Sequence, residues 1–177
     1  TDARWSNGDA VTAEDFVFSL RRSVDPKTLS NYSSMLYPIK NARDVVRGEM
    51  SPEELGVTAP APDVLKIELE ESTPYFIGLL SHSITYPVHP SSVEAYGSQF
   101  TRPENLVSNG AFVLSEWKVQ DYILVSRNKK YWNDAIRPWK KSSSIHWTML
   151  TPHLHAILRK SWFSRILFQA NSSHVLK

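Results

Sequence analysis

The histidines and serines are the side chains of this sequence that could carry acid–base or nucleophilic chemistry. His82 and His89 are the two histidines before residue 135, and both stand among Ser, Tyr and Pro residues. A serine nucleophile needs a strained elbow of the G-x-S-x-G type, and the sequence contains none. Loop or groove histidines are the simpler interpretation, so we expect that the protein is not an enzyme.

Metal and phosphate chemistry have equally little support. His146, His153 and His155 could be imagined as ligands, but residues 135–177 contain no Asp, Glu or Cys to complete a zinc site. Glu68 and Glu70 fall on the polar face of an alternating segment, which is typical of a solvated strand face. The phosphate-binding patterns G-x-G-x-x-G and G-x-x-x-x-G-K-[ST] are absent. We therefore expect no metal and no cofactor.

Aromatic side chains with a polar group are concentrated between residues 30 and 90, and such side chains suit a binding groove. The group consists of Tyr32, Tyr37, Tyr75, Phe76, His82 and Tyr86. Ordinary core packing is the alternative, and for Tyr75 and Phe76 on a short helix it is at least equally favoured.

Short helices and antiparallel strands have to position this group. A Thr12 cap followed by acids, apolar residues at helical spacing and the stop Asp25-Pro26 predict a helix. Capping and periodicity predict further helical segments at 41–47, 52–55, 75–80 and 93–96. Alternation predicts a strand over 65–69 after one near Val57, and an antiparallel hairpin of 111–117 with 122–127. This order predicts an α+β (mixed α/β) fold.

The charge distribution changes near residue 135. All 18 acidic residues precede it, against 13 Lys and Arg, whereas residues 135–177 carry seven Lys and Arg and no acid. Folded domains normally mix both signs along the chain. We therefore expect the basic tail, 139–177, to lie outside the fold of the rest. The alternative is a tail that binds nucleic acid or a membrane surface, for which 154–168 could form a basic amphipathic helix.

Composition indicates a globular protein without a disulfide framework, since 41% of the residues are apolar and none is cysteine. No apolar run approaches the roughly 20 residues of a membrane span. The first residues show neither an initiating methionine nor the basic and apolar regions of a signal peptide. We expect the sequence to begin inside a longer protein.

Residues 5–19, WSNGDAVTAEDFVFS, resemble the signature of the family 5 extracellular solute-binding proteins. Within that family they are most similar to the oligopeptide- and murein-peptide-binding receptors of bacterial ABC importers. Further motifs follow in the family's order up to about residue 137, namely DP at 25–26, SNYS at 30–33, LGV at 55–57, TPYF at 73–76, LLSH at 79–82, PVHP at 87–90, NGAF at 109–112, RN at 127–128 and YW at 131–132.

The resemblance implies part of a large three-lobed receptor with a periplasmic-binding-protein type II fold. Residues 1–90 are similar to most of the small second lobe, and 91–138 to the return into the first lobe with its hairpin. The resemblance stops at residue 138, and 139–177 would be a non-homologous tail, either disordered or produced by a shifted reading frame. Alternative members of the family take dipeptides, nickel or another small solute.

The resemblance further implies a periplasmic protein that captures oligopeptides for an ABC permease of the inner membrane. Tyr32 in SNYSS and His82 in LLSHS match substrate-binding residues that line side-chain pockets. The family's strand for the peptide backbone and its third lobe have no counterpart in this sequence. We therefore expect the chain by itself to bind weakly or not at all, and we expect no nucleic-acid partner.

Overall fold

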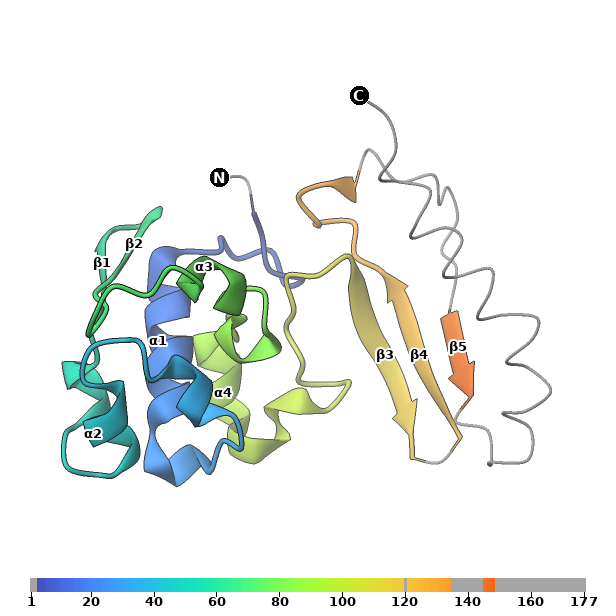
Figure 1. The fold of residues 1–177 in the computed structure, drawn as a ribbon. Coiled ribbons are helices and arrows are strands. Elements are labelled where there is room, and N and C mark those ends of the chain that lie inside the picture. Colours follow the sequence, from blue (N-terminus) through green and yellow to red (C-terminus); the bar gives the residue numbers. More distant parts are fainter. Residues whose placement is uncertain (1–2, 120, 135–144, 149–177) are drawn as a thin grey trace, which may run out of the picture.

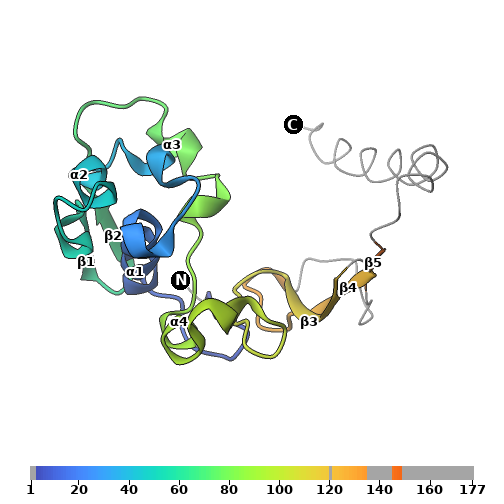
Figure 2. The same ribbon diagram turned by 90° about the horizontal axis from the view of Figure 1, so that it is seen from below.

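The computed structural model describes residues 3–119, 121–134 and 145–148. Helices gather around α1, and a layer of antiparallel strands (β3, β4 and β5) lies beside them, with α4 between the two parts (Figure 1). Figure 2 shows the same two parts from below. The α+β class predicted from the sequence is confirmed. In the described ranges no helix is long and apolar enough to cross a membrane.

Helix α1 (Ala13–Val24) begins and ends where its local sequence predicts. The backbone N–H of Thr12 donates to Oδ2 of Asp15 at 2.8 Å, which satisfies one of the free donors of the first turn. The helix ends at Asp25, whose extended backbone precedes Pro26. The helix has acidic residues in its first turn and Arg21 and Arg22 in its last, and these charges interact favourably with the helix dipole.

The other helices are short. They are α2 (Ala42–Val46), α3 (Phe76–Leu79) and α4 (Pro90–Tyr96), with 3-10 helices at Pro26–Thr28, Ser33–Leu36, Pro52–Glu54, Ser83–Thr85 and Gly97–Thr101. The segments predicted at 41–47, 52–55, 75–80 and 93–96 all correspond to one of these elements. The sequence did not predict Ser33–Leu36 or Ser83–Thr85, and these two carry the site described below.

Two small antiparallel sheets complete the fold. In the first, β1 (Val57–Ala61) pairs with β2 (Val64–Ile67). In the second, β3 (Phe112–Lys118) and β4 (Tyr122–Arg127) form the predicted hairpin. A third strand, β5 (Ile145–Thr148), pairs with β4 although we expected the fold to end before it. The remainder of the tail, including the amphipathic helix considered at 154–168, lies outside the described residues.

The hydrophobic core lies under one face of α1. Val17, Leu20 and Val24 of that helix pack against buried side chains from the segment that carries α2 and β1 and from α3. The buried partners are Leu36, Ile39, Ala42, Val45, Leu55, Val57 and Phe76. Because the site residues flank this cluster in sequence, its packing fixes their backbone.

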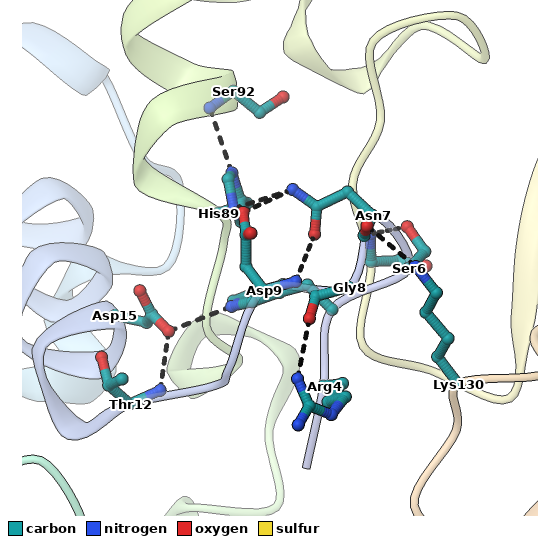
Figure 3. A network of polar contacts seen from close by, with 12 residues as sticks. Arg4, Ser6, Asn7, Gly8, Asp9, Thr12, Asp15, His89, Ser92 and Lys130 are labelled. Atoms are coloured by element: carbon teal, nitrogen blue, oxygen red, sulfur yellow. Dashed lines mark hydrogen bonds and ion pairs between the residues drawn. The ribbon is translucent and has the colours of Figure 1, made fainter.

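A polar network holds the loop before α1 against α4 (Figure 3). Oδ2 of Asp9 accepts hydrogen bonds from Asn7 at 2.6 Å and from Nε2 of His89 at 3.0 Å. The hydrogen bond from Asn7, followed by that from His89, lowers the pKa of Asp9 below its ordinary value. Nδ1 of His89 accepts the N–H of Ser92, so the buried imidazole also caps α4.

The same loop reaches α1 and the hairpin. The indole of Trp5, which is fully buried, donates to Oδ2 of Asp15 at 3.0 Å and lies edge-on to the ring of His89. On the other side Nζ of Lys130 donates to the carbonyl of Asn7 at 2.8 Å. The loop therefore connects the helical part to the chain that leaves β4.

Candidate functional site

Tyr32 and His82, the two substrate-binding residues predicted from the resemblance, lie in contact. Their ring centroids are 5.4 Å apart with 59° between the ring planes. Each residue immediately precedes a 3-10 helix, Ser33–Leu36 for Tyr32 and Ser83–Thr85 for His82. The ring of Tyr32 is largely exposed and that of His82 is half-buried, which leaves both accessible to a ligand.

The imidazole of His82 has a fixed orientation. Its Nδ1 accepts the backbone N–H of Ile84 at 3.2 Å, and its carbonyl accepts the hydroxyl of Thr85 at 2.8 Å. Because Nδ1 acts as an acceptor, the neutral ring carries its proton on Nε2. His82 can therefore offer one N–H donor to a ligand.

A pocket of about 220 Å³ opens beside this pair. Its lining comes from α1 and from the loops around Tyr32 and Tyr86, namely Ser19, Arg22, Ser23, Ser30, Tyr32, Ser83, Ile84, Tyr86 and Val88. The volume is below the roughly 300–1,000 Å³ of sites that enclose a drug-sized ligand. It suits a single side chain better than a whole small molecule.

The aromatic group of the sequence lies partly at the site and partly in the core, and Tyr37 and the exposed Tyr75 belong to neither. Tyr86 lines the pocket, and its hydroxyl donates to the carbonyl of Ser81 at 3.1 Å. Phe76 is buried in the core, so for this residue the packing alternative holds. Tyr37 lies under the guanidinium of Arg43, outside the pocket.

Sequence reasoning missed the contribution of α1 to the pocket. Ser19, Arg22 and Ser23 are spaced i, i+3 and i+4, so they share one face of the helix. The sequence signal for this contribution was the polar stripe on α1 beside its apolar face of Val17, Leu20 and Val24. Ser19 also joins α1 to the site loop, because its hydroxyl accepts the N–H of Val88 at 2.8 Å.

A larger hollow of about 660 Å³ lies near the start of α1. Its walls come from the N-terminal segment, the turn between β1 and β2, and the largely exposed Trp132. The hollow contains neither Tyr32 nor His82, and among the described residues its charged lining consists of Arg4 and Asp63. The smaller pocket therefore remains the better candidate, because donor groups converge there.

Metal binding has no structural candidate in the part of the chain that the structure describes, where no three His, Cys, Asp or Glu residues gather. His153 and His155 lie outside the described residues, and the prediction about them stays a prediction.

The sequence motif residues Glu68 and Glu70 are exposed as expected, and Glu68 pairs with Lys66 at 2.7 Å and with Lys40 at 3.5 Å.

Comparisons with known proteins connect this fold to one family. The sequence is 43% identical over 136 residues to the periplasmic oligopeptide-binding protein OppA of Escherichia coli, which covers 76% of this chain and 25% of that protein. It is 42% identical over 136 residues to the periplasmic murein peptide-binding protein MppA of the same organism, with the same coverage. The chain thus spans about a quarter of the length of these curated relatives.

The fold is similar to solved structures of the same kind. The structure of Haemophilus influenzae OppA in complex with RPPGFSPFR matches with a TM-score of 0.83 and 35% identity, covering 90% of this chain and 31% of that one. The sequence model of one protein family, described as bacterial extracellular solute-binding proteins, family 5 Middle, matches residues 1–153. This match continues past Pro138, where we expected the resemblance to end, and includes β5. The chain belongs to family 5 of the bacterial extracellular solute-binding proteins.

Proposed function

We propose that this chain is part of a receptor that captures oligopeptides for an ABC importer. The observation that carries the proposal is its 43% identity to an oligopeptide-binding protein. The fold similarity to a receptor in complex with a nonapeptide supports the same ligand class. The names of the relatives support a periplasmic location, and an inner-membrane permease is the partner that such a receptor requires.

Tyr32 and His82 contact a side chain of the bound peptide in this proposal. Support comes from their mutual contact, from the exposed Tyr32 ring and from the pocket that opens beside them. An aromatic face and a single N–H donor suit varied side chains, because neither demands one ligand shape. Receptors of many peptides need such tolerance, whereas affinity comes from the peptide main chain.

The affinity of this chain alone is expected to be low. It spans about a quarter of its relatives' length, so most of an enclosing cleft would come from sequence that is not included in it. The pocket is open to solvent, so a ligand is contacted on one side only. These few contacts offset little of the translational freedom that the ligand loses on binding. A dissociation constant of about 1 mM or weaker follows from contacts of this extent.

Titration of the isotopically labelled chain with alanine pentapeptide, followed by NMR, tests the proposal. We expect saturable shift changes for Tyr32, His82 and their neighbours. Tyr32→Ala and His82→Ala should each abolish most of these changes, because each removes one wall of the site. Tyr96→Ala is the matched control, since Tyr96 is similarly exposed but lies at the end of α4.

Three results would contradict the proposal. Shift changes that survive both site substitutions would place the ligand elsewhere. Micromolar binding would show that the described residues already form a complete site. A response to dipeptides or Ni²⁺ with none to pentapeptide would favour the small-solute members of the family.

A further inference from the structure

Arg22 is a half-buried cation that has no anionic partner among the residues that the structure describes. Its guanidinium lies 5.2 Å from the ring centre of Phe100. In the part of the chain that the structure describes, Arg22 makes no ion pair and donates no hydrogen bond to another residue. A partly desolvated arginine normally satisfies its five N–H donors with carboxylates or carbonyls. Its capacity to bind an anion is therefore unused.

The pocket that Arg22 lines is rich in donors, and no described residue contributes a carboxylate to it. Arg22 is the one charged residue of its lining, within the described part of the chain. The hydroxyls of Ser30 and Tyr32 make no hydrogen bond to the described protein residues, so they are also free to donate. His82, in contact with Tyr32, offers its Nε2 proton. A guanidinium, which can only donate, beside hydroxyls that are free to donate indicates a ligand that accepts hydrogen bonds.

Acidic residues do occur in a second hollow that Arg22 lines. The neighbouring hollow along α1 is lined by Glu14, Asp25 and Glu53 together with Arg21 and Arg22. Asp25 is engaged, because its side chain accepts the N–H of Lys27 at 2.9 Å. Hydrogen bonding, first to the backbone of its own segment, lowers the pKa of Glu53. Asp25 and Glu53 therefore have partners of their own, and none of the three acids lines the pocket beside Tyr32.

We propose that the pocket beside Tyr32 and His82 is a subsite for an acidic side chain of the bound peptide, with Arg22 as its counter-charge. The inference rests on the proposed function, because it names the side-chain class that this site prefers. The apolar Ile84 and Val88 contact the methylene groups of a glutamate, and the hydroxyls and guanidinium receive its carboxylate. The volume of about 220 Å³ accommodates one such side chain.

NMR titration of the full chain with two blocked amino acids tests this preference directly. N-acetyl-glutamate amide and N-acetyl-glutamine amide have nearly the same shape and differ by one charge. We expect the glutamate probe to bind about fivefold more tightly, the effect of one solvent-accessible charge pair. The Nε–H of Arg22 and the ring of Tyr32 should show the largest shifts, and the preference should decrease in about 1 M salt.

Arg22→Gln removes the charge and should abolish the preference. Arg43→Gln is the matched control, because Arg43 also lies over a tyrosine ring, that of Tyr37, but outside the pocket. Its substitution should leave the fivefold ratio unchanged. Equal binding of the two probes by the unmodified chain, or no response to either, overturns the inference. Sulfate binding as tightly as the glutamate probe also overturns it, because the site would then be a general anion site.

The alanine pentapeptide separates this inference from the proposed function. Variants of the pentapeptide with one alanine replaced by glutamate or by glutamine extend the comparison. If the pentapeptide binds but glutamate at no position gives tighter binding than glutamine, the acidic subsite is wrong and the receptor function stands. If the glutamate probe binds through Arg22 while pentapeptides do not bind, the pocket chemistry is supported and the receptor function of this chain fails.

Discussion

Gly56 lies where three backbone segments cross, and its replacement by alanine tests whether this crossing is close-packed. Its N–H donates to the carbonyl of Lys40 at 3.0 Å, and its own carbonyl accepts the N–H of Glu68 at 2.7 Å. The N–H of Lys40 in turn donates to the carbonyl of Glu68 at 2.9 Å. These bonds hold the residue that follows β2 and the segment before α2 against Gly56.

A methyl group at position 56 would have no space. It would lie 2.7 Å from Cβ of Lys40 and 3.1 Å from the carbonyl oxygen of Glu68, well inside ordinary contact distances. Overpacking of this kind costs about 1–3 kcal/mol, and alanine recovers about 0.4–1 kcal/mol by restricting the unfolded chain. We expect Gly56→Ala to lower the free energy of unfolding by about 1–2 kcal/mol.

Gly78→Ala is the matched control. Gly78 lies within α3, is exposed, and has nothing within 4 Å of an added methyl group. The same substitution there should raise the free energy of unfolding by about 0.5–1 kcal/mol. Urea unfolding followed by far-UV circular dichroism measures both variants. If Gly56→Ala proved as stable as Gly78→Ala, the crossing would be loosely packed and the reasoning would be refuted.

Three further substitutions test the core and the loop network. Trp5→Phe removes the buried hydrogen bond to Asp15 and should cost about 1.5–3 kcal/mol by urea unfolding, whereas Trp132→Phe, at an exposed position, should change stability by less than about 0.5 kcal/mol. Leu36→Ala opens a cavity beneath α1 and should cost about 2–5 kcal/mol; a smaller loss in the same assay would mean that the core collapses around it. The lowered pKa of Asp9 stabilises the fold above the unfolded pKa, near the ordinary 3.8, and this contribution is lost as pH falls through the folded pKa. Asp9→Asn should therefore make the decline of stability below about pH 4 shallower, and an unchanged pH profile would contradict the assignment.

Local sequence was sufficient where an element depends on its own residues. Helix α1 has its cap, its apolar face and its stop within residues 12–26, and the hairpin of β3 and β4 has its alternation and turn within 111–127. Both were predicted nearly at their observed bounds. The peptide-receptor family was also evident from motif order, because so many short motifs rarely coincide in one sequence.

Elements that depend on distant partners were not predicted. Strand β5 has four residues and no clear period, and it is defined by pairing with β4. The 3-10 helices after Tyr32 and His82 are single turns, whose conformation depends on the surrounding core. The origin of the basic tail, including the hypothesis of a shifted reading frame, stays a prediction, because most of that segment lies outside the described residues.

The sequence by itself determined the family and the helix and hairpin that form the frame, and it predicted Tyr32 and His82 as ligand-binding residues. Tertiary structure decided that Tyr32 and His82 touch across fifty positions of chain, and that Arg22 of α1 lines the pocket beside them. The physical reason is that capping and alternation act over a few residues, whereas a pocket forms where segments distant in sequence pack on a common core.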